Sequence, residues 1–327
     1  MTTTDNERRG LPAHGYAGLA IILAAEASLL AGSAFVGRWF TPLVWTGYLL
    51  LVDALVFRRR GRSLLRTNRI EFLIVCVVSI LCWWLFEFYN SPRFWRSDLE
   101  LWWHYHNLEP NPYLRRVGYD WAFATIFPAL FETAELFAAV LGSRRRGEAR
   151  RQGAVSRREP PRALLYVLIA LGAASALLPL FVLNAWLVPL VWLGLALLFD
   201  PLNALRGWPS VTADLFRRRR LRLAALSLAG VACGALWEFW NYWAVSRWTY
   251  TVPYQLFGLK VFEMPILGYL GYPPFAVECW AMYVFLRSLL GPRRWPSQGW
   301  SAACSGSSGT TGPSRAGRTR CRTSSSA

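Results

Sequence analysis

Apolar runs of about twenty residues recur along the chain, and they are the feature that most restricts how it can fold. A run of this length spans the hydrocarbon core of a bilayer as an α-helix. Because a helix satisfies its own backbone hydrogen bonds, such runs are stable in lipid. Hydrophobic residues also make up 54% of the 327 residues. We therefore expect an all-α integral membrane protein.

The apolar runs predict about eight transmembrane helices. Their expected bounds are 16–36, 41–57, 70–90, 118–141, 163–183, 185–200, 221–241 and 264–289. The first run resembles a secretory signal, but Glu26 interrupts it and it has a counterpart later in the chain, so we expect a retained helix. Pro265 and the pair Pro273 and Pro274 predict a bent or broken entry into the last helix.

The formal net charge of +17 comes from arginines that gather in short segments between the apolar runs. The loops after the second, fourth and sixth runs are arginine-rich, and the intervening loops carry few positive charges. Positively charged loops remain in the cytoplasm. This distribution predicts a bacterial cytoplasmic (inner) membrane protein with both termini in the cytoplasm. It favours contact with membrane lipids and argues against nucleic-acid binding.

An internal duplication organises the chain, because five segments recur in the same order. The matched pairs are "WFTPLVWTGYLLLVD" (39–53) with "WLVPLVWLGLALLFD" (186–200), arginine-rich loops, "FEFYN" (86–90) with "WEFWN" (237–241), "WHY" (103–105) with "WTY" (248–250), and "PALFE" (128–132) with "PFAVE" (274–278).

Each copy contains four expected spans, so both copies enter the membrane from the same side. The repeats should be parallel and related by a pseudo-two-fold axis along the membrane normal. The expected organisation is a first four-helix repeat (1–142), a basic cytoplasmic linker (143–162), a second four-helix repeat (163–291) and a disordered tail (292–327) rich in Ser, Gly, Thr and Arg.

Four glutamates within the spans are the candidate catalytic residues: Glu87, Glu132, Glu238 and Glu278. An acid in hydrocarbon is costly and marks a candidate functional site, as general acid or base, proton relay or cation ligand. Counting along the helix places Glu132 near the midplane, and an outward-opening cleft would link the two acids of each copy. The alternative is that each acid bonds a Trp, Tyr or Asn and holds the helices together.

The candidate ligand-binding residues surround these acids. Asn90 and Asn241 lie three positions after Glu87 and Glu238, on the same helix face. The remaining candidates are in the outward loops and at the last helix: Trp103, Tyr105, Trp248, Tyr250 and Glu263. Asp53 and Asp200 stand beside arginine-rich loops, where surface ion pairs or helix caps explain them.

His104 and His106, with a neighbouring glutamate, would be the starting point for a zinc or copper site. Two ligands at this spacing are too few to define a metal. The second copy has Thr249 and Thr251 in their place. We therefore expect an interfacial aromatic loop without a metal. No phosphate-binding glycine loop, nucleophile elbow, HExxH or paired CxxC occurs, and no cofactor is predicted.

One stretch resembles the lycopene cyclase domain of carotenoid-forming bacteria and fungi, through Trp248, Tyr250, Gly258 and Pro265. That family is a polytopic, duplicated membrane protein in which a Trp-x-Tyr/Phe loop leads to a Gly and then to a Pro-x-Glu-Glu motif with catalytic acids. Here Leu267 and Gly268 stand in place of the acids, and Glu263 precedes the proline. The family's halves also usually have three spans. The resemblance implies an isoprenoid-like substrate.

The leading hypothesis is a duplicated intramembrane site that binds or modifies an apolar, lipid-like ligand of the isoprenoid class. Two alternatives remain at this point. The same glutamates could titrate in a proton- or cation-coupled transporter, or they could fix helix packing in a structural or assembly protein.

Overall fold

The computed structural model describes residues 10–91, 102–148, 158–182, 184–251, 253 and 256–290. Its long helices are α2 (Ala13–Leu30), α4 (Phe40–Arg60), α6 (Arg69–Asn90), α7 (Pro112–Glu148), α8 (Arg162–Phe181), α9 (Val188–Leu205), α11 (Leu221–Trp243) and α12 (Tyr272–Leu289). All of these except α9 and α12, six in total, are long and apolar enough to cross a bilayer. The protein is thus an all-α, multi-pass membrane protein.

Short elements connect the long helices. They are α3 (Ala34–Arg38), α5 (Leu64–Thr67), β1 (Trp103–His106), η1 (Ala185–Leu187), α10 (Val211–Phe216), β2 (Arg247–Tyr250), η2 (Leu256–Gly258), β3 (Lys260–Val261), β4 (Met264–Pro265) and η3 (Ile266–Gly271). The strands form two small antiparallel ribbons, β1 with β2 and β3 with β4. In the first ribbon, Trp103 is opposite Tyr250 and Tyr105 is opposite Trp248.

Each predicted span overlaps one long helix, but several bounds differ from the expectation. The first run divides into α2 and α3, because Gly32 adopts a left-handed backbone conformation with φ 78°. The last span was predicted too long. Residues 264–271 form β4 and η3, which confirms the broken entry at Pro265, and α12 begins only at Tyr272.

The expected tail and part of the expected linker fall outside the described residues. Helix α7 continues to Glu148, so the N-terminal part of the predicted 143–162 linker is helical. Residues 149–157 and the tail from 291 onward lie outside the described residues.

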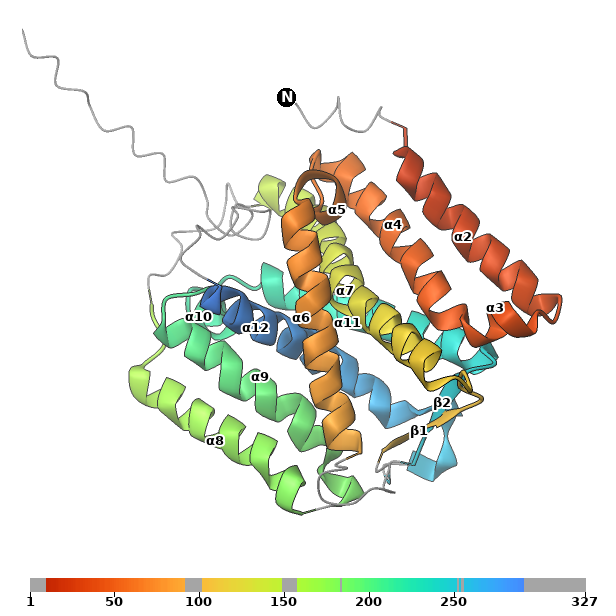
Figure 1. Ribbon diagram of the computed structural model, residues 1–327. Coiled ribbons are helices and arrows are strands. Elements are labelled where there is room, and N and C mark those ends of the chain that lie inside the picture. The colour runs from red at the N-terminus through yellow and green to blue at the C-terminus, as the bar shows by residue number, and fades with distance from the viewer. Residues whose placement is uncertain are drawn as a thin grey trace, which may run out of the picture.

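Figure 1 shows α2 and α8 on opposite flanks of the molecule, with α4 beside α2 and α9 beside α8. Glycines permit these close contacts. A Cβ atom on Gly18 would lie 2.4 Å from the carbonyl oxygen of Gly47, and one on Gly172 would lie 2.4 Å from the amide nitrogen of Leu198. Small residues let helix backbones approach in this way in membranes.

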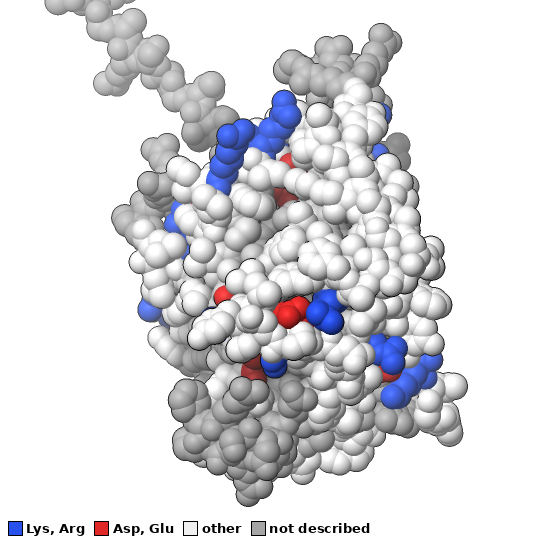
Figure 2. Space-filling model, turned by 45° about the vertical axis from the view of Figure 1, so that its right-hand side comes forward, with Lys and Arg blue, Asp and Glu red and all other residues white. Residues whose placement is uncertain are grey.

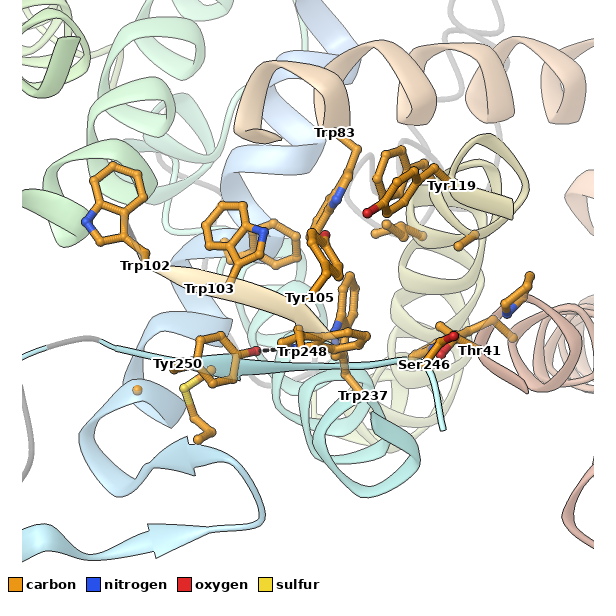
Figure 3. A pocket seen from close by; sticks show the side chains of 18 of the residues that line it. Thr41, Trp83, Trp102, Trp103, Tyr105, Tyr119, Trp237, Ser246, Trp248 and Tyr250 are labelled. Atoms are coloured by element: carbon orange, nitrogen blue, oxygen red, sulfur yellow. Dashed lines mark hydrogen bonds between the residues drawn. The ribbon is translucent and has the colours of Figure 1, made fainter. Parts of the chain in front are cut away.

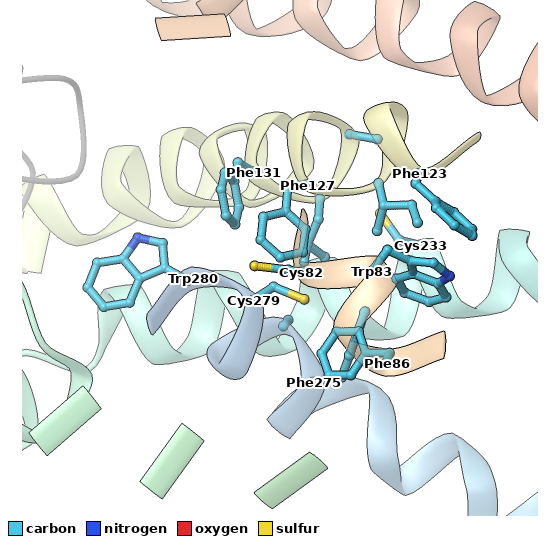
Figure 4. Packing of buried hydrophobic residues seen from close by; sticks show 14 of the residues in the cluster. Cys82, Trp83, Phe86, Phe123, Phe127, Phe131, Cys233, Phe275, Cys279 and Trp280 are labelled. Atoms are coloured by element: carbon cyan, nitrogen blue, oxygen red, sulfur yellow. The ribbon is translucent and has the colours of Figure 1, made fainter. Parts of the chain in front are cut away.

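Helices α6, α7, α11 and α12 form the centre of the molecule. Helix α7 packs on both α6 and α11, and α12 also packs on α11. Figure 4 shows the aromatic rings and thiols that fill this centre, with Phe127 beside Phe131. The outer helices bury little of their surface, since only 22% of the apolar stretch of α2 and of α8 is buried. Most of the face in Figure 2 carries no charged side chain, as expected of a surface in lipid.

Two buried aspartates hold the short helices α5 and α10. Asp53 accepts hydrogen bonds from the Ser63 hydroxyl and the Leu65 N–H, both at 2.8 Å. Asp200 accepts from the Ser210 hydroxyl at 2.9 Å. The expected cap role is thus confirmed for both residues, although neither lies at the surface, because α4 and α9 continue past them.

A buried ion pair joins α6 to α12. The Arg287 guanidinium donates from Nε to Glu71 Oε1 at 2.7 Å and from Nη2 to Glu71 Oε2 at 3.1 Å. The two side chains are only 7% and 5% exposed. The Tyr283 hydroxyl also donates to Glu71. This bidentate contact ties the first half of the chain to its last helix.

Glu71→Gln should lower the free energy of unfolding by about 3–5 kcal/mol, because it leaves the buried Arg287 charge uncompensated. The measurement is denaturation of the purified protein in detergent. The double variant Glu71→Leu/Arg287→Met should recover most of the loss, since it removes both charges.

The matched control is Arg217→Gln, which breaks an ion pair with Glu159 in which the side chains are 35% and 61% exposed. It should cost no more than about 1 kcal/mol. Equal losses in Glu71→Gln and Arg217→Gln would contradict the assigned role of the buried pair.

Candidate functional site

A cavity of about 560 Å³ lies between α4, α6, α7, α9, α11 and the ribbon of β1 and β2 (Figure 3). Its size is that of a small-molecule binding site. Eight of the 18 tryptophans line it: Trp39, Trp45, Trp83, Trp102, Trp103, Trp192, Trp237 and Trp248. Tyr105, Tyr119, Tyr250, Tyr272, Phe123 and Phe275 add further aromatic rings to the wall, which is otherwise mostly aliphatic.

The aromatic rings of the wall pack against one another. Trp237 is at the centre, with ring centroids 5.0 Å from Trp83, 5.8 Å from Trp45 and 5.6 Å from Trp248. Tilted and edge-to-face contacts of this kind contribute beyond simple burial of area. The wall is therefore held by ring-to-ring contacts from three helices and one strand.

Glu87 lies behind one part of this wall and accepts hydrogen bonds from three of its residues. The donors to Oε1 are the Trp83 indole at 3.1 Å, the Trp103 indole at 3.3 Å and the Tyr105 hydroxyl at 2.5 Å. Burial, and next the Glu87 carboxylate, raise the pKa of Tyr105 well above its usual value, so the hydroxyl keeps its proton and donates.

Glu238 has the same relation to the opposite part of the wall. Its Oε1 accepts from the Tyr250 hydroxyl at 2.8 Å and from the Tyr272 hydroxyl at 2.6 Å. The Trp248 indole in turn donates to the Tyr250 hydroxyl at 2.7 Å (Figure 3). Burial raises the pKa of Tyr250 well above its usual value. Both glutamates thus orient aromatic residues that line the cavity.

Asn90 and Asn241 hold the two strands that carry the aromatic residues. The Asn90 amide donates to the Trp103 carbonyl at 2.8 Å and accepts from the N–H groups of Trp102 and Trp103 at 2.9 and 3.1 Å. Asn241 pairs with the carbonyl and N–H of Trp248 at 2.8 and 2.9 Å. Neither asparagine lines the cavity, and each side chain is bonded to backbone.

Glu132 also lies away from the cavity. Its Oε1 accepts from the Leu64 N–H at 2.6 Å, at the start of α5, beside Asp53. It is 1% exposed. Glu132 therefore shares the cap of α5 with Asp53.

Glu278 is fully buried, and within the described residues neither of its carboxylate oxygens has a hydrogen-bond partner. Unlike Glu132, Glu278 takes no part in the cap of a short helix in the part of the chain that the structure describes. Asp200 accepts from both the Val211 and the Thr212 N–H groups, at 2.7 and 2.8 Å. In the first half of the chain, Asp53 and Glu132 divide the corresponding donors between them.

The structure does not bring the four candidate glutamates into one cleft, and none of them lines the cavity. Of the other predicted residues, Trp103, Tyr105, Trp248 and Tyr250 do line it. Glu263 instead forms an ion pair with Arg247 at 3.7 Å.

The two loop histidines face the opposite strand. His104 Nε2 lies 2.8 Å from Thr251 Oγ1, and His106 Nε2 lies 2.8 Å from Thr249 Oγ1. In the described part of the chain, no group of three or more His, Cys, Asp or Glu side chains could hold a metal. The threonines that replace the histidines in the second copy are thus their partners.

Sequence reasoning missed several residues of the wall. Trp45 and Trp192 occupy equivalent places in the first pair of matched segments, and both line the cavity. The matching of these tryptophans was a signal that could have identified them. Three charged residues at the cavity, Arg38, Glu109 and Arg115, had no such signal.

Asn90→Ala should lower the free energy of unfolding by at least about 2 kcal/mol, because buried backbone groups of Trp102 and Trp103 lose their partners. Near-ultraviolet circular dichroism should also change as these indoles lose their fixed packing. The control is Asn111→Ala, which removes an exposed bond to the Tyr113 N–H and should cost about 1 kcal/mol. Equal costs for the two variants would contradict the anchoring role of Asn90.

No protein-family model, curated protein or solved structure matches this chain. The functional argument therefore starts from the residues of the cavity.

Proposed function

We propose that this protein binds an apolar, lipid-like ligand of the isoprenoid class in the aromatic cavity. The observation that carries the proposal is that polar atoms of the wall residues form their hydrogen bonds behind the wall, away from the cavity. The Trp103 indole and the Tyr105 hydroxyl donate to Glu87, and the Tyr250 hydroxyl donates to Glu238, behind the wall. A ligand in the cavity would meet mainly aromatic and aliphatic side chains.

Such a wall favours one class of ligand. A polar solute would lose its hydrogen bonds to water and find few partners, which is costly. An apolar chain loses nothing comparable, and its burial is favourable in proportion to the area removed from water. Ring faces also attract cationic groups. The same cavity would therefore suit acid-catalysed chemistry on an isoprenoid, which passes through cationic intermediates, with Glu87 behind Tyr105 and Glu238 behind Tyr250 as candidate acids.

The proposal includes an architecture of eight membrane-spanning helices in two parallel four-helix repeats. Equivalent contacts support the repeat: Asp53 and Asp200 cap short helices, and Asn90 and Asn241 bind the strands that follow them. The arginine-rich loops support cytoplasmic termini in a bacterial inner membrane.

Gly271→Leu should weaken ligand binding by partly filling the cavity. Gly271 lines the cavity, has an ordinary helical backbone with φ −75°, and has no atom within 4 Å of an added Cβ. Leucine should therefore fit without strain. With farnesol as the probe, quenching of tryptophan fluorescence should show affinity reduced by about tenfold or more.

The control is Gly142→Leu on α7, outside the cavity, where an added Cβ meets only Leu221 at 3.9 Å. It should leave farnesol binding unchanged. Farnesol binding that is undetectable in the parent protein, or equal in Gly271→Leu and the parent, would overturn the proposal. Comparative lipid profiles of a deletion strain, including pigments, would then identify the natural ligand class.

A second candidate function, proton-coupled transport, is favoured by Glu278 alone. An acid buried in a membrane protein without a hydrogen-bond partner is a candidate proton site. The Glu278→Gln variant separates the two functions. If the protein is a ligand-binding protein, farnesol affinity should stay unchanged, since Glu278 does not line the cavity.

If the protein is a proton-coupled transporter, vesicles should show a flux that an uncoupler abolishes, and Glu278→Gln should abolish it as well. Glu132→Gln is the comparison variant, because its carboxylate has a backbone partner. Uncoupler-sensitive flux that survives in Glu278→Gln would exclude this role for the residue.

A further inference from the structure

Three charged residues interrupt the otherwise uncharged lining of the cavity: Arg38, Glu109 and Arg115. Arg38 ends the short helix α3, and Arg115 lies in the first turn of α7. Both contact Glu109. The Arg38 Nη1 donates to Glu109 Oε2 at 3.2 Å, and the Arg115 Nε donates to the Glu109 backbone carbonyl at 2.9 Å.

This cluster carries one more positive than negative charge. Arg115 donates to the backbone carbonyls of Glu109 and Pro110 and, within the described residues, has no carboxylate at ion-pair distance. Arg38 uses only Nη1 in the described contacts and its side chain is 37% exposed. A guanidinium has five N–H donors, so both residues keep donors for a further acceptor.

The neighbouring Arg116 differs from Arg38 and Arg115 in its charge partner and in its position relative to the cavity. It forms an ion pair with Asp120 at 2.8 Å, lies over the Trp84 ring at 4.1 Å, and does not line the cavity. The excess charge is thus confined to the two arginines at the cavity.

We infer that the ligand is an amphipathic lipid whose head group is a phosphate, held by Arg38 and Arg115, with its apolar chain in the aromatic cavity. Guanidinium groups bind phosphate oxygens through parallel, charge-assisted hydrogen bonds. A phosphate with two negative charges would more than compensate the single excess positive charge, and it would compete with Glu109 for Arg38. This inference deepens the proposed function and rests on it.

The test compares farnesyl phosphate with farnesol, which have the same chain and differ only in the head group. Binding is followed by tryptophan fluorescence in detergent, with inorganic phosphate as a third ligand. Farnesyl phosphate should bind the parent protein about tenfold or more tighter than farnesol, the scale expected for hydrogen bonds to a charged group. Inorganic phosphate should bind far more weakly than either.

Arg38→Gln and Arg115→Gln should each remove most of this difference, because they lower the affinity for farnesyl phosphate much more than the affinity for farnesol. Arg38→Lys keeps the charge but not the fork of donors, so it should retain only part of the difference. Arg116→Gln is the matched control and should retain all of it.

Equal affinities for farnesol and farnesyl phosphate in the parent protein would overturn the inference and leave the proposed function intact. Failure of both lipids to bind would overturn the proposed function as well. If inorganic phosphate bound as tightly as farnesyl phosphate, the arginines would be a site for a free anion, and the inference of a lipid head group would be wrong.

Discussion

The hydrogen bonds that Glu87 and Glu238 accept from aromatic donors are the interactions on which the cavity depends. A carboxylate in hydrocarbon is stable only when it is paired or bonded. Here the donors are also the residues of the cavity wall, so satisfying the acids fixes the rings. Asn90 and Asn241 complete this arrangement, because they fix the backbone of the strands from which these rings project.

The two halves of the chain use different acceptors for the N–H donors at the start of a short helix. In the first half, Asp53 and Glu132 divide the N–H donors at the start of α5. In the second, Asp200 accepts two donors of α10, and Glu278 is left without a partner among the described residues. One hydrogen bond thus distinguishes Glu132, which caps a helix, from Glu278, a buried acid without such a bond in the described part of the chain. The matched positions are therefore not interchangeable.

Apolar periodicity was enough to predict the long helices, and repeated motifs were enough to predict Trp103, Tyr105, Trp248 and Tyr250 at the cavity. The acids were harder to place. The position of a residue along a helix predicts its depth in the membrane, but it does not predict which neighbouring helix or strand the side chain contacts. Glu132 is beside α5 and Asn90 is beside β1, and both contacts depend on loops whose paths no periodicity describes. Arg38 and Arg115 meet only through Glu109, which is distant from Arg38 in the chain.

The size of the cavity is itself an argument for an apolar occupant. If the cavity of about 560 Å³ stayed empty, the side chains that line it would lack packing contacts, which is destabilising. Collapse is opposed because hydrogen bonds to Glu87 and Glu238 hold the rings that line it. Water needs polar partners, and this wall offers them at few positions, chiefly Arg38, Glu109 and Arg115. An apolar chain fills the volume without that cost, and the arginines at Glu109 give a phosphate end of such a chain a defined position.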